Sequence, residues 1–155
     1  MSGSTHGQSR QPEPYHPLEE EVFLNLQRTA DAVLRQTAAL LKTADLSPAQ
    51  YNVLRVLRAS GSGGLKCREL AGKMVTRDPD MTRLLDRMEK RGLIARQRQS
   101  RDRRVVETKV TVAGLDLLES LDEPMQSVIQ RVLAHMDRPS LRRLNLLLEE
   151  AREGS

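Results

Sequence analysis

The residues best suited to chemistry in this sequence are arginines, and their spacing favours the binding of anions. Arg83 and Arg87 stand four residues apart, so on a helix they share one face, where like charges repel each other unless an anion lies nearby. Residues 101–104, Arg-Asp-Arg-Arg, place three cations around one acid. Guanidinium groups bind phosphates and the edges of guanine bases. Both groups of arginines therefore indicate a surface that meets a polyanion.

Positive charge is concentrated in the middle of the chain. The 155 residues carry a formal net charge of +4. Residues 66–109 contain fourteen Lys or Arg and seven Asp or Glu, a net charge of +7, which leaves −3 on the remainder. The modest total hides a strongly dipolar molecule, and its central segment favours nucleic acid as a partner.

The composition narrows the partner and argues against several functions. Tyr15, Phe23 and Tyr51 are the only aromatic residues. Proteins that bind single strands stack bases on exposed aromatic rings, so a duplex is the favoured target. Cys67 is the only cysteine, which excludes an intramolecular disulfide and a zinc site built on several thiolates. The sequence shows neither the residues of a catalytic triad nor histidines at the spacing of metal ligands, so we expect that the protein is not an enzyme and binds no metal or cofactor.

The amino-terminal part of the sequence changes character at residue 18. Residues 1–17 are rich in Pro, Gly and Ser and are typical of a disordered tail. The sequence has neither a signal-peptide pattern nor an apolar run long enough to cross a membrane, so we expect a cytoplasmic protein without a membrane partner. From Leu18 to Leu41 apolar residues recur every three to five positions, which predicts a helix of about 25 residues. Its length suggests that the far end packs against a partner.

Helix and turn signals alternate from residue 46 onward. Ser47 suits a helix cap, Pro48 the first helical position, and Gln50 closes a capping box. A short strand at 65–66 and a helix near 68–74 are expected next.

Another helix is predicted by Asp78 as cap and Pro79 in the first position, and it ends at Lys90-Arg91-Gly92. Residues 93–98 and 105–110 predict two strands around a polar turn. A helical region then runs from 111 past 132, with Pro124 as a kink or break, and a last helix covers 140 to about 152.

Several strings in this order resemble the MarR family of bacterial transcriptional regulators. They are Leu46-Ser-Pro-Ala-Gln-Tyr-Asn-Val-Leu54, Glu69-Leu-Ala71, the run from Met81 to Ile94, and Arg101-Asp-Arg-Arg104 leading into Val110-Thr-Val-Ala-Gly114. The resemblance spans about residues 18–150. It implies a mostly α fold with a small β wing: a winged helix-turn-helix DNA-binding domain at 46–110, and a helical dimerisation region made of 18–45 and 111–155.

The resemblance also implies how DNA is read. The recognition helix, Pro79–Arg91, is expected in the major groove, and the wing tip in the minor groove through Asp102 and Arg104. The implied partner is an inverted-repeat operator of double-stranded DNA, bound by a homodimer. The candidate DNA-binding residues are Arg77, Asp80, Thr82, Arg83, Asp86, Arg87, Arg101, Asp102, Arg103 and Arg104.

Three residues are candidates for regulation. A pocket between the dimer helices and the DNA-binding domain is implied by the resemblance, where a small aromatic or anionic effector would meet Arg55 or Arg58. Cys67 lies between Lys66 and Arg68 near a helix start, surroundings that suit a redox-sensing thiol. Its position is equally that of a small helix cap, where the family commonly has Ser or Thr.

The sequence therefore predicts a cytoplasmic, homodimeric, sequence-specific regulator of transcription, in the first place a repressor that a small ligand releases from DNA. Two alternatives stand beside it. One is a winged-helix protein that binds a ligand or partner but no operator. The other is a repressor that senses oxidation through Cys67.

Overall fold

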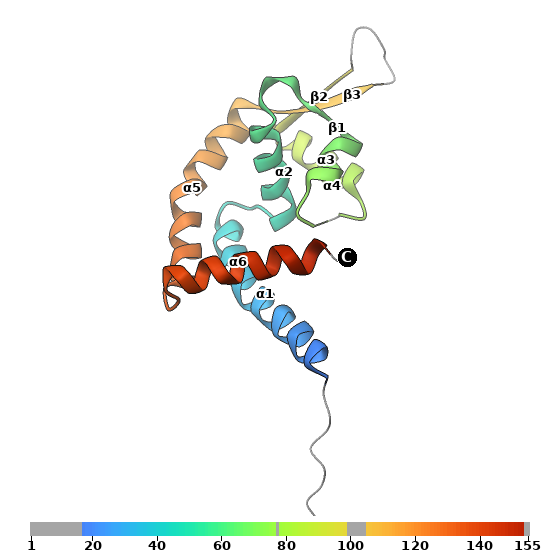
Figure 1. Cartoon of the computed structure of the whole chain (residues 1–155). Helices are drawn as coiled ribbons and strands as arrows, with labels where there is room; N and C mark the ends of the chain where they lie inside the picture. Colours follow the sequence, from blue (N-terminus) through green and yellow to red (C-terminus); the bar gives the residue numbers. More distant parts are fainter. Residues whose placement is uncertain (1–16, 77, 99–104, 154–155) are drawn as a thin grey trace, which may run out of the picture. The chain divides into compact units, whose positions relative to one another are not determined.

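The structure of the protein is a computed structural model, which describes residues 17–76, 78–98 and 105–153 (Figure 1). The chain divides into two compact units, Met1–Ala32 and Val33–Ser155. In the first unit, the described residues from Leu18 onward form the beginning of helix α1 (Leu18–Thr43), whose first turn carries three glutamates that suit the positive end of a helix. The predicted long helix is confirmed.

The second unit is organised around helix α2 (Pro48–Ala59), which begins as the sequence predicts. The backbone N–H of Gln50 donates to Ser47 Oγ at 3.1 Å, and the backbone N–H of Ser47 donates to Gln50 Oε1 at 2.9 Å. This reciprocal capping box satisfies two donors that a helix start otherwise leaves without partners. Leu54 and Leu57 are fully buried, so α2 runs through the core.

A three-stranded antiparallel sheet lies at one end of this unit. Its strands are β1 (Leu65–Lys66), β2 (Ile94–Arg98) and β3 (Val106–Val110), in the order β1-β3-β2. Ile94 faces Val110 in the register of the hairpin, and Leu65 faces Thr108 on the other side of β3. Each strand was predicted to within one residue. The sequence did not show that β1 joins the wing strands in one sheet.

Helices α3 (Cys67–Lys73) and α4 (Met81–Lys90) complete the helix-turn-helix, and α4 begins later than the sequence suggests. We predicted Asp78 as the cap and Pro79 as the first helical residue. Instead, the backbone N–H of Asp80 donates to Asp78 Oδ1 at 2.8 Å, which closes a turn before the helix. Asp80 then caps α4 by accepting the backbone N–H of Arg83 at 3.1 Å. Two acidic residues thus divide the tasks of turn and cap.

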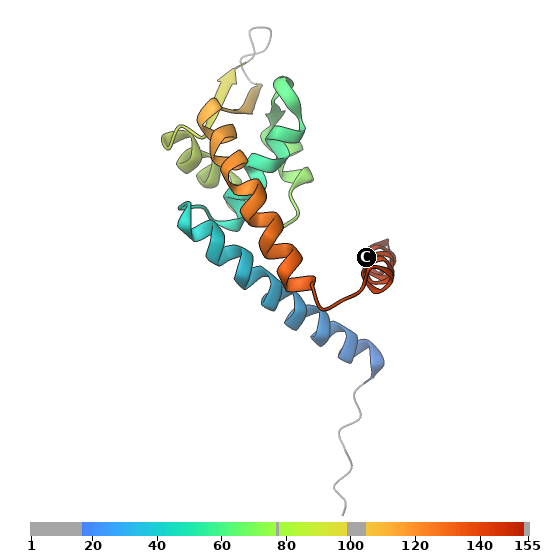
Figure 2. The same cartoon turned by 90° about the vertical axis from the view of Figure 1, so that its left-hand side faces the viewer.

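Helix α5 (Val112–Leu133) packs along α2, as Figure 2 shows, and α6 (Arg138–Glu153) ends the described chain. Thr111 caps α5, since its Oγ1 accepts the backbone N–H of Gly114 at 3.1 Å. We expected a kink or a break at Pro124, and the helix continues through this residue without a break. The ring of Pro124 is exposed on the solvent side of α5, while Leu121 and Met125 on either side of it are buried.

Gly114 is the tightest point of this packing. A Cβ at this position would lie 2.2 Å from the carbonyl oxygen of Leu93 and 2.9 Å from Val110 Cγ2. The first turn of α5 therefore rests directly on the base of the β2–β3 hairpin. Gly72, in α3, has nothing within 4 Å of the same point.

Gly114→Ala should lower the free energy of unfolding by about 1–3 kcal/mol, because backbone must move to admit the methyl group. Gly72→Ala should leave it unchanged or raise it by up to about 1 kcal/mol, because alanine favours helices and the site is open. Urea denaturation of both variants and the wild type would measure the difference. A Gly114→Ala protein as stable as Gly72→Ala would contradict the close packing.

Candidate nucleic-acid interface

The outward face of α4 presents the side chains that sequence analysis assigned to DNA. Thr82, Arg83 and Arg87 are exposed, whereas Leu84 and Met88 are buried in the core beneath them. This division follows the period of 3.6 residues per turn. The side chain of Arg83 is 77% exposed, so its guanidinium is available to a partner.

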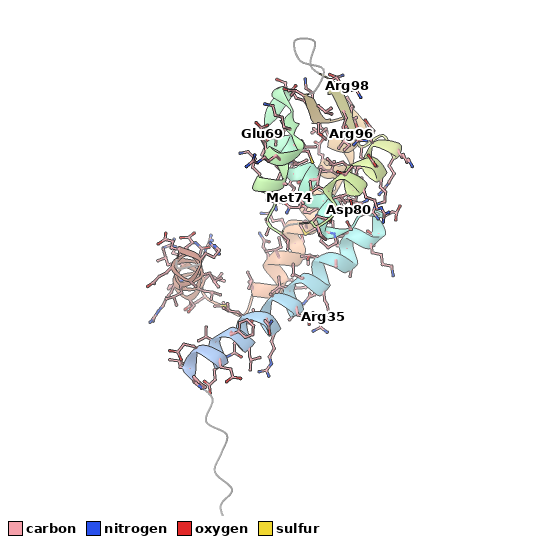
Figure 3. All side chains as sticks on the ribbon, turned by 90° about the vertical axis from the view of Figure 1, so that its right-hand side faces the viewer. Arg35, Glu69, Met74, Asp80, Arg96 and Arg98 are labelled. Carbon is pink, nitrogen blue, oxygen red and sulfur yellow. The ribbon has the colours of Figure 1, made fainter. Side chains whose placement is uncertain are left out.

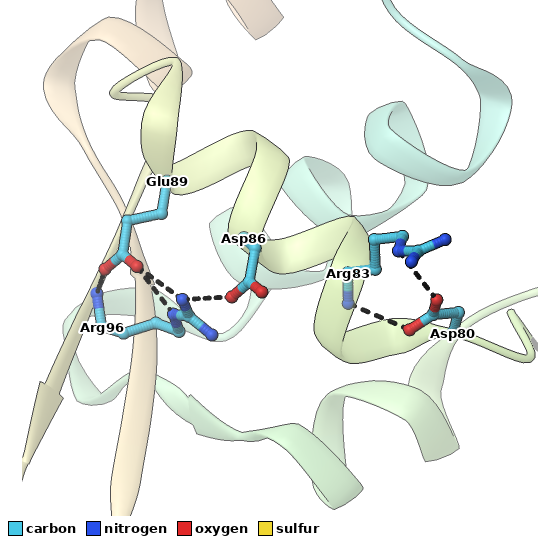
Figure 4. A network of polar contacts seen from close by, with 5 residues as sticks. All are labelled: Asp80, Arg83, Asp86, Glu89 and Arg96. Carbon is cyan, nitrogen blue, oxygen red and sulfur yellow. Dashed lines mark hydrogen bonds and ion pairs between the residues drawn. The ribbon is translucent and has the colours of Figure 1, made fainter.

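Asp80 orients Arg83 at the start of this face. Besides capping α4, its carboxylate lies with Oδ2 3.4 Å from Nε of Arg83, as Figure 4 shows. The carboxylate is therefore engaged by its own helix. A direct contact between Asp80 and DNA stays a prediction, and the structure gives this residue a second task.

A network that the sequence did not reveal joins α4 to the wing. Arg96, on β2, donates from Nε to Glu89 Oε2 at 2.9 Å and from a terminal nitrogen to the same oxygen at 2.7 Å. Its backbone N–H donates to Glu89 Oε1 at 3.0 Å, and its guanidinium also donates to Asp86 (Figure 4). The hydrogen bonds from the Arg96 side chain and backbone hold the pKa of the Glu89 carboxyl below its usual value.

This network changes the interpretation of Asp86. We placed Asp86 among the DNA-binding residues, yet its carboxylate is turned to Arg96 on the wing side of α4. The side chain of Arg96 is only 26% exposed, so three charged groups share a partly buried site. Arg96 and the neighbouring Arg98 differ in this respect: both lie along β2 in Figure 3, but Arg98 is exposed. A contact of Asp86 with DNA stays untested.

Five of the candidate residues lie outside the described part of the chain. They are Arg77, Arg101, Asp102, Arg103 and Arg104. The strands on either side of the wing tip are paired up to Arg98 and Val106. Their contacts with DNA stay predictions.

Cys67 is exposed and opens α3 as its first residue. The cap position belongs to Lys66, whose backbone N–H donates to Glu69 Oε2 at 2.9 Å. The interpretation of Cys67 as a helix cap is therefore wrong by one position. Its role as a redox sensor stays a prediction.

Both effector candidates line one cavity of about 470 Å³ in the second unit. The cavity lies between the carboxyl-terminal part of α1, α2, α5 and the α3–α4 loop, and Leu34, Met125 and Ile129 give it apolar walls. Arg58 donates two hydrogen bonds across it, at 2.7 and 2.9 Å, to the two carboxylate oxygens of Asp122.

The charges in this cavity do not balance. Arg58 and Asp122 neutralise each other, and the hydrogen bonds from Arg58 hold the pKa of the Asp122 carboxyl below its usual value. Arg55 also lines the cavity, with its guanidinium carbon 5.8 Å from the centre of the Tyr51 ring. One positive charge and an apolar wall therefore remain for a ligand.

Other kinds of site find no support in the described residues. Across 17–76, 78–98 and 105–153, no three His, Cys, Asp or Glu side chains gather as they would around a metal ion. The helices of the same ranges all lack the combination of length and apolar character that crossing a membrane requires.

Comparisons with known proteins agree with this arrangement. The family model described as MarR family matches residues 46–106. A solved MarR transcription factor from Planctomyces limnophilus is 38% identical, with a TM-score of 0.68 over 87% of this chain and 98% of that one. The transcriptional repressor MdtR of Bacillus subtilis is 29% identical over 77% of this chain and 76% of its own. A MarR mutant from Escherichia coli complexed with operator DNA shares the fold, with 22% identity and a TM-score of 0.77 over 88% of this chain and 99% of that one.

Arg96→Gln should lower the free energy of unfolding at pH 7 by about 1–2 kcal/mol, between the values for exposed ion pairs and for hydrogen bonds to charged groups. The pKa of Glu89 is lower in the folded than in the unfolded protein. The Arg96–Glu89 pair therefore stabilises the folded protein at pH values above the unfolded pKa of Glu89, and this contribution disappears as the pH falls. The difference from wild type should therefore shrink below about pH 4. Chemical denaturation at pH 7 and pH 3.5 measures it, and Arg98→Gln is the matched control. Equal effects of the two substitutions would show that the network adds nothing.

Proposed function

The chain belongs to the MarR family of transcriptional regulators, and from this premise we propose that it binds a double-stranded DNA operator as a homodimer and represses transcription until a small ligand releases it. The observation that carries the proposal is the outward face of α4, where Thr82, Arg83 and Arg87 are exposed above a buried apolar face. A major groove admits one α-helix, and arginine is the usual partner of guanine there. The wing supplies a second contact, through the minor groove.

Apolar surface at both chain ends supports the homodimer. Leu18, Val22 and Phe23 on α1 are about half exposed or more, and so are Leu146 and Leu147 on α6. A protein that left these side chains in water would lose the free energy of burying them, so a second copy is the expected cover. A two-fold dimer presents two equivalent recognition helices, which requires an inverted repeat with half-sites about one helical turn apart.

The same proposal implies a cellular location and a non-enzymatic role for the protein. A regulator that acts on bacterial DNA works in the cytoplasm. Its task is ligand-dependent binding, so no catalytic group is needed.

The effector follows from the cavity that Arg55, Arg58 and Asp122 share. With one positive charge in excess and apolar walls, the best ligand is an aromatic or aliphatic monocarboxylate whose body displaces water from Met125 and Ile129. Arg55 is the residue free to meet the carboxylate, since both terminal nitrogens of Arg58 bind Asp122.

Release from DNA requires that the ligand favour a different placement of α4. Val75 and Thr76 of the α3–α4 loop line the cavity, and this loop leads to the Asp80 cap of α4. A ligand that contacts the loop can bias its position, and with it the orientation of α4.

Selection from a random-sequence duplex library with the purified protein should yield an inverted repeat. Arg83→Ala should weaken binding to this repeat by about 1–3 kcal/mol and relax the base preference at one position in each half-site, because a base contact is lost.

Arg104→Ala should weaken binding to the same repeat and remove a preference for A·T-rich flanks, because a narrow minor groove attracts arginine. Arg131→Ala, on the last turn of α5, is the control for charge. No enrichment of any sequence by wild type would contradict the proposal.

Asp122→Asn should tighten the binding of 1-naphthoate several-fold, because it leaves both arginines of the cavity without a carboxylate. Asp116→Asn removes the same charge from the exposed side of α5 and is the control. Calorimetric titration measures both, with the neutral 1-naphthamide as matched ligand. Equal binding of the acid and the amide, unchanged by Asp122→Asn, would show that the cavity does not select an anion.

A further inference from the structure

A second cavity, of about 540 Å³, lies beside α4 and shares only Arg87 with the surface proposed above to meet DNA. It is formed by the last turn of α1, the α1–α2 turn, the start of α2 and the carboxyl-terminal half of α4. Its polar lining includes Lys42, Gln50, Arg87, Lys90 and Arg91. We call this cavity the corner site.

Positive charge is in excess at the corner site. Four cations line it, and Asp45 is the only acid among the lining residues. Arg91 donates to the backbone oxygen of Asp45, and a second guanidinium nitrogen lies 3.6 Å from Asp45 Oδ2. The Asp45 side chain is 96% exposed, so water screens its charge strongly. Within the described residues, the other three cations line the cavity and make no ion pair with an acid.

Gln50 gives the corner site a donor that does not depend on charge. This residue is about nine-tenths buried, and its side-chain oxygen accepts the backbone N–H of Ser47. Its amide N–H groups make no hydrogen bond to any residue in the described ranges. The amide nitrogen itself is accessible, because no fully buried side-chain nitrogen or oxygen of the described residues lacks a hydrogen bond, so it is open to an acceptor that enters the cavity.

The corner site and the wing lie on opposite flanks of α4. Asp86 and Glu89 occupy one flank and are held by Arg96 of the wing. Arg87 and Arg91, one helical turn apart, occupy the other flank and line the corner site. A helix in the major groove lies between two phosphate backbones, and the wing side can approach only one of them.

We propose that the corner site binds one backbone phosphate of the DNA on which α4 docks, on the flank opposite the wing. Lys42, Lys90 and the Gln50 amide donate to its oxygens, and Arg87 and Arg91 add charge. This proposal rests on the proposed DNA binding and extends it, because it makes the end of α1 a third point of contact. Phosphate contacts position a protein on DNA without reading sequence.

The first test compares Lys42→Gln and Lys90→Gln with wild type, on the selected duplex and on an unrelated duplex of equal length. Each variant should bind both duplexes about tenfold more weakly, and the slope of log K against log salt should become shallower by about 2, for one phosphate in each protomer. Arg131→Gln removes the same charge far along α5 and should change neither quantity. Melting curves check that the variants fold. Binding and slope equal to those of Arg131→Gln would overturn the proposal.

The second test identifies the phosphate. In duplexes of the selected sequence, one phosphate at a time is replaced by an uncharged methylphosphonate. The loss of binding by the wild-type protein then shows which phosphates it needs. Lys42→Gln and Lys90→Gln should both become indifferent to the same phosphate in each half-site, and Arg131→Gln should keep the wild-type pattern. An unchanged pattern in the lysine variants would overturn the corner contact. So would stabilisation by 10 mM inorganic phosphate that only these variants lose, since the cavity would then hold a free anion. Failure of wild type to select any duplex would overturn both this contact and the proposed function.

Discussion

The burial of one face of α4 is the constraint on which the rest of this structure depends. Leu84, Leu85 and Met88 are almost completely buried, which fixes the rotation of the helix about its axis. Once that rotation is fixed, the period of the helix determines which side chains face outward and which face sideways. The outward residues meet DNA bases in our proposal, one flank contacts the wing, and the other flank lines the corner site.

Those two flanks carry opposite charges and have opposite tasks. The acidic flank, Asp86 and Glu89, is satisfied inside the protein by Arg96, so it adds rigidity and attracts no ligand. The basic flank, Arg87 and Arg91, faces a cavity with too few acids to balance it. A uniformly basic helix would bind phosphate more strongly but would not hold the wing. The observed division allows both within ten residues.

Local signals made most of the fold predictable. The capping box at Ser47 and Gln50 and the turn at Gly92, whose φ is +70°, act over three or four residues and can be recognised in a sequence. The start of α4 was misplaced because Asp78 and Asp80 are both good caps, and only the geometry of the turn decides between them. Arg96 was missed because its partners lie across a reversal of the chain. The Arg58–Asp122 pair joins residues 64 positions apart, which no local pattern indicates.

Thr111 makes a very short and rigid connection between strand and helix. It is the single residue between β3 and α5, its hydroxyl donates to the backbone oxygen of Gly92, and its backbone N–H donates to Leu93. With Gly114 seated on Leu93, the hairpin base and the first turn of α5 must move as one piece. Helix α5 therefore acts as a lever about 33 Å long, and a tilt of about 5° displaces its far end by about 3 Å. A small tilt of α5 at the hairpin base therefore produces a larger displacement at the far end of the helix.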